Sequence, residues 1–334
     1  MPTFVARCLA IACTVTALPA VAACPDYTTA AHPPTLAGPV KKPFASVINH
    51  VLAARYQPWH MAHDAIVKAG TAAAIRAKFD YDPVLHKDLE AERVHVYLYG
   101  TGMAGWQYVG NYLTDSDGKI DVPLGTQAVG EYVVRFVVEG DLSSTSGYLS
   151  VVEPGRDTIV FDIDGTLTTS DVEAYADYAG VRTATPYRYA PEMVKAWREK
   201  GYQLIFLSAR PYWVTRDGRA WLGIQGIAPW HYHSNPYSGG PVPPDTRKFK
   251  GDYVRHLRDA VGLNLVRVYG NALTDIGAYA DAGMAKADTY IIGPHAGVAG
   301  TRPLHGEYGE HYRLLVRPAP LARCRADATL PAPF

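Results

Sequence analysis

The chain has 334 residues, enough for two domains with hydrophobic cores of their own, and its 48% of apolar residues is ordinary for a globular protein. Lysine plus arginine and aspartate plus glutamate both number 32, so the formal net charge is zero. This balance argues against nucleic acid as a partner, because such proteins carry a basic field. The function must therefore depend on local sites.

Residues 1–23 have the pattern of an export signal. Arg7 is their only charged side chain, an apolar run follows it, and residues 19–23 are small. We therefore expect an exported protein, periplasmic or secreted, whose mature chain begins near Cys24. Of the cysteines, only Cys24 and Cys324 then remain. They either form a disulfide, which accounts for both, or Cys24 carries a lipid anchor, because residues 21–24 resemble a bacterial lipoprotein processing site.

Residues 24–43 are rich in proline and predict a tether with little regular structure. Residues 44–155 are expected to form a helical segment followed by a β-sandwich domain. The helical segment has apolar residues at helical spacing, and His60 to Val67 are expected on a second helix. From Ala72 onward the apolar period changes to two, in short runs joined by turns such as Asp117-Gly118. This pattern is typical of a small sandwich.

Residues 156–318 alternate between apolar runs and helical segments, which predicts a doubly wound α/β domain with a parallel sheet. Residues 319–334 are expected to be a C-terminal tail. The expected strands are Thr158 to Phe161, Gln203 to Leu207, Leu265 to Tyr269 and Thr289 to Ile292. Ligands of such sheets bind at the carboxyl ends of the strands.

Polar side chains follow three of these strands directly. They are Asp162 and Asp164 after the first, Ser208 and Arg210 after the second, and Asn271 and Asp275 after the third, with Lys250 on the helix before the third. Because the strands are expected to be parallel, these side chains should converge on one edge. A single polar residue at a strand end is common, but the whole set is much less expected by chance, which indicates a functional site.

The chemistry that needs this set is phosphoryl transfer through an aspartyl-phosphate. Asp162 would attack phosphorus, and Asp164 would give a proton to the leaving oxygen and later take one from water. Mg²⁺, held by Asp162, the backbone carbonyl of Asp164 and Asp275, would offset the repulsion between nucleophile and phosphate. Ser208 would bind a phosphoryl oxygen, and Lys250 would stabilise the transition state.

Residues 161–172, 207–210 and 269–275 resemble motifs of the haloacid dehalogenase superfamily. Within it they are similar to the catalytic domain of lipins and to the related domain of membrane-associated phosphatidylinositol transfer proteins, in which a β-rich segment precedes the domain. The resemblance covers residues 44–300 and implies a haloacid dehalogenase-like fold with a minimal cap. The remaining motif residues are expected to contact substrate: Gly165, Thr166, Ala209, Arg210 and Asn271.

In lipins the resemblance implies Mg²⁺-dependent conversion of phosphatidate to diacylglycerol; in the transfer proteins it implies phosphatidate recognition. The chain retains each motif position but departs from lipins in its export signal and in residues 239–244, a Gly- and Pro-rich loop before the lysine. Lys250 is favoured because Phe249-Lys250 fits the family register, and Lys248 is the alternative.

The inserts 167–207 and 209–249 are too short for a covering domain, since independent folding needs about 40 residues beyond the core elements that they contain. An open site suits a large substrate or a head group at a membrane surface. Several tyrosines of the first insert, together with Tyr212 and Trp213, are expected near the mouth, either at a lipid interface or packed against the domain. His231 and His233 would shape the pocket or be solvated.

The leading hypothesis is an exported Mg²⁺-dependent phosphatase acting on an anionic phospholipid, most directly phosphatidate. Two alternatives stay open. The first is a phosphatidate- or phosphoinositide-binding or lipid-transfer module without turnover. The second is a general phosphatase for soluble phosphomonoesters.

Overall fold

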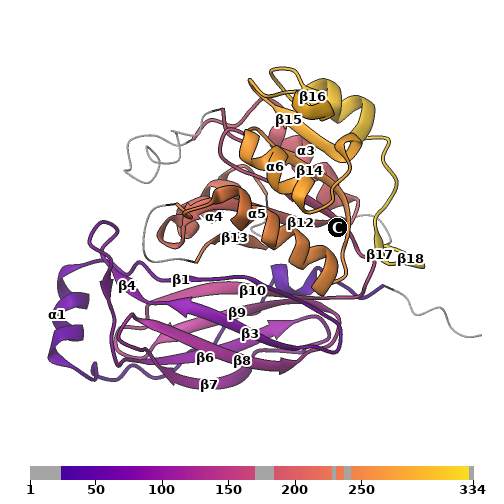
Figure 1. The fold of residues 1–334 in the computed structure, drawn as a ribbon. Coiled ribbons are helices and arrows are strands. Elements are labelled where there is room, and N and C mark those ends of the chain that lie inside the picture. Colours follow the sequence, from indigo (N-terminus) through magenta and orange to yellow (C-terminus); the bar gives the residue numbers. More distant parts are fainter. Residues whose placement is uncertain (1–23, 170–183, 228–230, 237–241, 331–334) are drawn as a thin grey trace, which may run out of the picture.

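The computed structural model describes residues 24–169, 184–227, 231–236 and 242–330. They form a β-sandwich followed by an α/β domain that lies against it (Figure 1). This is the fold class that the sequence predicts. The expected signal, residues 1–23, lies outside the described residues, as does the segment 170–183 with Tyr175 and Tyr178.

The sandwich encloses its core between a three-stranded sheet, order β1-β3-β8, and a five-stranded sheet, order β2-β10-β9-β6-β7. Apolar side chains of both sheets, among them Ile75, Val96 and Phe136, are buried together. The elements are η1 (Thr29–Ala31), α1 (Val47–Arg55), β1 (Met61–Ala62), β2 (Ala65–Lys68), β3 (Ala72–Lys78), β4 (Asp80–Tyr81), β5 (Lys87–Asp88), β6 (Arg93–Gly100), β7 (Gln107–Leu113), β8 (Lys119–Thr126), β9 (Gly130–Val138) and β10 (Ser144–Val152).

The predicted second helix over His60 to Val67 is wrong. The segment forms two short strands, in which Met61 pairs with Lys78 of β3 and Ala65 pairs in parallel with Leu149 of β10. Apolar residues in so short a run are compatible with either period, and pairing with the sheet edges decides in favour of strands.

The α/β domain is built on a six-stranded parallel sheet, order β13-β12-β11-β14-β15-β16. Its strands are β11 (Asp157–Phe161), β12 (Gln203–Pro211), β13 (Tyr232–Asn235), β14 (Asn264–Gly270), β15 (Thr289–Ile292) and β16 (Arg302–Leu304). The four strands expected from the sequence are confirmed, and β13 and β16 extend the sheet at its two edges. Every residue of the inner strand β11 is buried, which explains its continuous apolar sequence.

Helices cover both faces of this sheet (Figure 1). Ile159 and Phe161 of β11 share a core with Trp197 of α3, whereas Val160 shares the other core with Val254 of α5. The helices are α3 (Ala190–Glu199), η2 (Tyr212–Val214), α4 (Thr215–Ile224), α5 (Thr246–Arg255) with the π-helical turn η3 (His256–Ala260), α6 (Leu273–Asp281), η4 (Lys286–Asp288), η5 (Val298–Gly300), α7 (Gly309–His311) and the π-helical turn η6 (Tyr312–Val316).

Buried polar contacts join the two domains. Arg156 Nη1 lies 3.0 Å from Glu131 Oε1, and both side chains are almost fully buried. Asp64 of the sandwich accepts hydrogen bonds from Arg219 Nη2 at 2.5 Å and from the backbone N–H of Tyr232 at 2.7 Å. Because a charge buried at the junction needs its partner in the other domain, a misaligned junction would leave buried charges unpaired, and its geometry is therefore specific.

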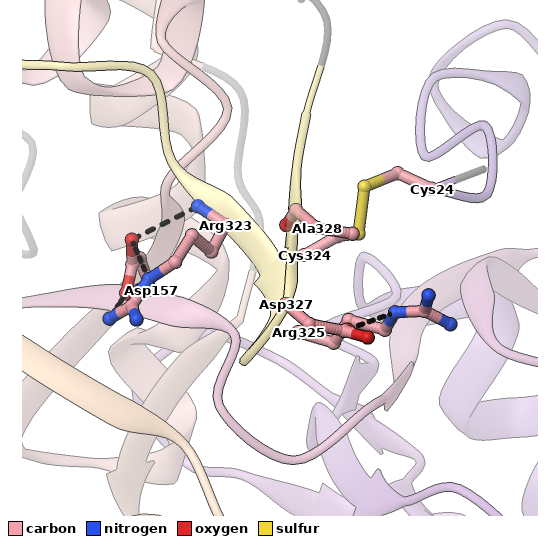
Figure 2. Close-up of a disulfide and its surroundings, with 7 residues drawn as sticks. All are labelled: Cys24, Asp157, Arg323, Cys324, Arg325, Asp327 and Ala328. Carbon is pink, nitrogen blue, oxygen red and sulfur yellow. Dashed lines mark hydrogen bonds and ion pairs between the residues drawn. A yellow bond between two sulfur atoms is a disulfide. The ribbon is translucent and has the colours of Figure 1, made fainter. Parts of the chain in front are cut away.

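The ends of the described chain are joined by a disulfide between Cys24 and Cys324 (Figure 2). A sulfur that is bonded to Cys324 cannot also carry a thioether-linked lipid, so this structure has the first of the two arrangements that the sequence allows. The expected C-terminal tail contains a hairpin, β17 (Arg323–Arg325) with β18 (Ala328–Thr329). Arg323 fixes the hairpin to β11 through an ion pair of 2.9 Å with Asp157.

Candidate functional site

The strand register brings the predicted residues to one edge of the sheet. Phe161, the last residue of β11, pairs with Phe206 of β12 and with Tyr269 of β14. The residues that follow these three positions therefore leave the sheet side by side at its carboxyl edge. Asp162, Ser208 and Asn271 all lie within this layer.

Asp162 is buried at the centre of the site, with 3% of its surface exposed. Its Oδ1 accepts a hydrogen bond of 2.6 Å from Lys250 Nζ, and its Oδ2 accepts one of 2.7 Å from Thr166 Oγ1. Burial raises the pKa of Asp162, and the carboxylates of Asp275 and Asp164 act in the same direction, whereas Lys250 opposes them. The carboxylate is thus fixed in orientation by two donors.

Lys250 reaches this carboxylate from α5 and is itself 5% exposed. Its Nζ also lies 2.6 Å from Asp275 Oδ1, so one ammonium group bridges two carboxylates. Burial tends to lower the pKa of Lys250, but the two acids outweigh it and raise it. Lys248, the alternative from the sequence, lies on the exposed side of α5 and pairs with Asp252. The structure therefore places Lys250, and not Lys248, at the site.

Asp275 also caps the start of helix α6. Its Oδ2 accepts hydrogen bonds of 3.0 Å from the backbone N–H groups of Asn271 and Ala272. Gly270 permits this close approach, because a Cβ atom there would lie 2.6 Å from the Cβ of Asp275. The turn after β14 thus sets the direction in which Asp275 meets Lys250.

Asp164 is held by Arg210 in a two-pronged ion pair. Arg210 Nη2 lies 2.6 Å from Asp164 Oδ1, and Arg210 Nε lies 2.9 Å from each carboxylate oxygen. Ser208 Oγ donates to Asp164 Oδ2 at 3.2 Å and accepts from the backbone N–H of Arg210 at 3.1 Å. In this arrangement Asp164 is an acceptor on both oxygens. To donate a proton, it would have to release one of these contacts.

The loop after β11 is shaped by Gly165, whose φ of +67° lies in the left-handed region. Its N–H donates to Thr168 Oγ1 at 3.1 Å. Thr166 Oγ1 is also 3.3 Å from Asn271 Oδ1, which ties this loop to the turn after β14. Ala209, between Ser208 and Arg210, is half-buried. All the predicted site residues thus meet at one place.

The donor set is suited to a hard divalent cation. Two carboxylates, Asp162 and Asp275, share a single lysine, so one negative charge is left uncompensated. Within the described residues, no group of three or more His, Cys, Asp and Glu side chains is arranged to hold a metal ion. If a cation binds at this edge, the ligands expected from the sequence are these two carboxylates and the backbone carbonyl of Asp164, the kind of oxygen ligands that Mg²⁺ prefers.

Sequence reasoning did not find two supports of the site that come from distant segments. Tyr308 donates from its hydroxyl to the backbone carbonyl of Thr166 at 2.8 Å. Trp59 of the sandwich donates from Nε1 to the carbonyl of Trp213 at 2.9 Å, just after the strand that carries Ser208. Neither residue lies in a motif, so no sequence signal pointed to them.

The aromatic residues of the described mouth are packed and not laid on the surface. Tyr212 is 6% exposed, and Trp213 lies against the ring of His86 of the sandwich. His231 is buried and its ring stacks with that of Tyr253, while His233 stacks between Tyr253 and Phe249. These side chains support the framework behind the site. Among the described helices, none combines the length and apolar character needed to span a membrane.

Comparison with known proteins places both domains. Residues 159–293 match the family model described as "PITM 1-3, LNS2 domain", and residues 58–151 match "PITM 1-3, beta-sandwich domain". Membrane-associated phosphatidylinositol transfer protein 1 of Rattus norvegicus is 29% identical over 238 residues, which are 70% of this chain and 18% of that protein. Protein retinal degeneration B of Drosophila melanogaster gives the same identity and coverage.

The chain therefore matches less than a fifth of the length of these two relatives. Among solved structures, the HAD domain of effector protein Lem4 from Legionella pneumophila is 9% identical, covers 48% of this chain and 93% of that one, and has a TM-score of 0.32. The two family models cover residues 58–151 and 159–293, and they support the expected LNS2 domain, a lipin-like, haloacid dehalogenase-type domain that is shared with the membrane-associated phosphatidylinositol transfer proteins.

Proposed function

We propose that this chain binds the phosphomonoester head group of an anionic membrane lipid, of the phosphatidate type, at the Asp162 edge of the sheet. The observation that carries the proposal is the convergence of Lys250, Arg210 and Ser208 on a cluster of carboxylates. The names of the related proteins, which are phosphatidylinositol transfer proteins, support a lipid as the carrier of the phosphate.

The charges of the site make Mg²⁺ part of this proposal. Asp162, Asp164 and Asp275 face two cations, Lys250 and Arg210, so a phosphate dianion alone would add to an existing negative charge. A divalent cation held by Asp162 and Asp275 would supply the missing positive charge. We therefore expect head-group binding at the Asp162 edge to require Mg²⁺, so that this contribution to vesicle binding is lost on chelation.

Hydrolysis of the bound ester is the second candidate, and the position of Asp162 favours it. Lys250 and Thr166 fix its two oxygens, so one can attack phosphorus while the ester P–O bond breaks and Asp164 protonates the departing alcohol. Water would then attack the phosphorus of the aspartyl-phosphate and give its proton to Asp164, while the P–O bond to Asp162 breaks and releases inorganic phosphate and the free carboxylate.

Binding without turnover ranks first because of the Arg210–Asp164 pair. Hydrolysis needs Asp164 as a proton donor, and in this structure both of its oxygens accept hydrogen bonds from Arg210. A charge-assisted, two-pronged pair of this kind is strong. Its opening would have to accompany substrate binding if the chain is a phosphatase.

Two measurements on one set of samples separate the candidates. Co-sedimentation with phosphatidylcholine vesicles containing phosphatidate tests binding, and release of inorganic phosphate tests turnover, each with Mg²⁺ and with EDTA. The variants are Asp162→Asn and the control Asp259→Asn, which changes an exposed aspartate on η3. Mg²⁺-dependent binding without phosphate release supports the first candidate.

Phosphate release that Asp162→Asn abolishes and Asp259→Asn preserves supports hydrolysis. Similar rates on phosphatidate and on glycerol phosphate would instead indicate a general phosphatase for soluble esters. If the protein shows no vesicle binding and no phosphate release in the presence of Mg²⁺, the proposal is overturned. A localisation outside the cytoplasm, expected from residues 1–23, is a further proposal, and fractionation of the source cells would test it.

A further inference from the structure

A cavity of about 580 Å³ lies at the junction of the two domains, apart from the Asp162 site. Its walls are the segment Gln57–Met61, the start of β10 at Ser143–Ser146, and one face of α4. None of Asp162, Asp164, Ser208 and Lys250 lines it. Its volume falls in the range of small-molecule sites, which is about 300–1,000 Å³.

Two arginines of α4 give this cavity a positive wall. Arg216 and Arg219 are three residues apart and therefore share one face of the helix. Arg216 Nη1 donates to the carbonyl of Pro58 at 2.8 Å, and its guanidinium lies 4.5 Å from the ring centre of Trp59. Within the described residues, no carboxylate forms an ion pair with Arg216, so its charge is uncompensated.

Arg219 has hydrogen-bonding capacity to spare. Its Nη2 pairs with Asp64, and its Nη1 donates to the carbonyl of Ser146 at 3.1 Å. Its Nε is buried and has no hydrogen-bond partner among the described residues. A buried donor without a partner is costly, so a further acceptor close to this guanidinium would be stabilising.

The part of the lining from the sandwich offers hydroxyl groups. Ser143, Ser144, Thr145 and Ser146 follow one another along it. A further cation is close, since Arg135 Nη1 donates to Ser144 Oγ at 3.3 Å. Arginine forks and hydroxyl donors that line the same cavity are complementary to the oxygens of a phosphate group. The cavity is larger than a bare phosphate and has room for the group that carries it.

We propose that this junction cavity is a second anion site, which binds a phosphate group either as a free ion or ester or as part of a lipid head group. It needs no metal, because arginines supply the charge, and in this it differs from the Asp162 site. It also lies between the domains, so its occupant would contact both Arg216 of the α/β domain and the hydroxyl wall of the sandwich.

The local probe is the indole N–H of Trp59, which donates to Trp213 beside Arg216. Inorganic phosphate is titrated in EDTA, so that a Mg²⁺-dependent Asp162 site stays empty, and the Trp59 indole signal is followed by NMR after assignment with Trp59→Phe. The variants are Arg216→Gln, which alters an exposed side chain and spares the Asp64 pair, and Arg302→Gln, an exposed arginine on β16.

We expect a saturable shift of the Trp59 signal in the wild type and in Arg302→Gln. Arg216→Gln should weaken binding at least about tenfold, because a charge-assisted hydrogen bond contributes about 1.5–3 kcal/mol and 1.4 kcal/mol is a factor of ten. A signal that phosphate leaves unmoved, together with vesicle binding that Arg216→Gln does not change, would overturn the proposal. The proposal would also be overturned if Arg216→Gln bound phosphate with the same affinity as the wild type.

A second arm identifies the source of the phosphate. Phosphatidylcholine vesicles with phosphatidate are co-sedimented with the same three proteins in EDTA. Loss of vesicle binding in Arg216→Gln but not in Arg302→Gln assigns the site to a lipid head group. A shift with inorganic phosphate and no difference between the variants on vesicles assigns it to a soluble phosphate. Because both arms run without Mg²⁺, failure here leaves the Asp162 proposal untouched.

Discussion

Replacing Lys250 by methionine should strongly destabilise the α/β domain. Methionine fills a similar volume but removes the ammonium group that bridges Asp162 and Asp275 at 2.6 Å each. Lys250 is only 5% exposed, so water cannot take over its role. Removing one partner of a buried ion pair costs about 3–5 kcal/mol, and here two carboxylates lose their shared partner. We expect a loss in that range in EDTA at pH 8.

The loss should shrink as the pH is lowered. In Lys250→Met, Asp162 and Asp275 are left as neighbouring buried carboxylates, and protonation of one relieves their repulsion. Burial already raises the pKa of Asp162 in the wild type, so this relief should begin well above the usual range of an aspartate. The free energy of unfolding, measured by urea titration at pH 8 and pH 5.5, tests both statements.

Lys248→Met is the matched control, because it makes the same change two residues away on the exposed side of α5. It should leave the urea midpoint unchanged. Equal midpoints for the two variants, or a loss below about 1 kcal/mol in Lys250→Met, would refute a bridging role for Lys250, since that is the range of an exposed pair. A loss that grows toward low pH would refute the electrostatic explanation.

Two further predictions concern stability outside the site. Cys24→Ser should lower the free energy of unfolding by about 2–5 kcal/mol, which is the usual loss when a native disulfide is removed. Dithiothreitol should lower the melting temperature of the wild type and leave that of the variant unchanged. Equal sensitivity of both proteins to dithiothreitol would contradict the Cys24–Cys324 bond. Burial lowers the pKa of His231 to about 3, so the unfolded chain binds the proton first as the pH falls below about 6.5. The free energy of unfolding of the wild type, relative to that of His231→Phe, should therefore decrease by up to about 1.4 kcal/mol per pH unit during acidification. A difference that stays constant from pH 7 to pH 5 would speak against a neutral, buried His231.

Much of the site could be predicted from the sequence because a buried parallel strand has a distinctive pattern. Residues Thr158 to Phe161 form a continuous apolar run that ends at Asp162, and a strand buried on both faces needs such a run. The same holds for β12, which precedes Ser208, whereas β14 before Asn271 is only partly buried over its first four residues. Since the strands are parallel, the order of motifs along the chain is enough to place their ends together.

The choice between Lys250 and Lys248 needed the tertiary structure. Both lysines lie in the first half of α5, and the helical period alone allows either to face the sheet. Packing decides, because Val254 and Leu257 are buried against the sheet, and Lys250 shares their side of the helix. The Arg210–Asp164 pair was also invisible, since a contact between the ends of two strands depends on side-chain directions.

What the sequence by itself determined was the set of local patterns: the strand ends that carry Asp162 and Asp164, the two-domain order, and a disulfide as one of two fates for Cys24. The tertiary structure alone decided that His60 to Val67 are strands, because only the sheet edges beside them choose between two compatible periods. It alone placed Arg216 and Arg219 beside the hydroxyl groups of Ser143–Ser146. Contacts between domains leave no periodic trace in a sequence, since each partner reads there as an ordinary surface residue.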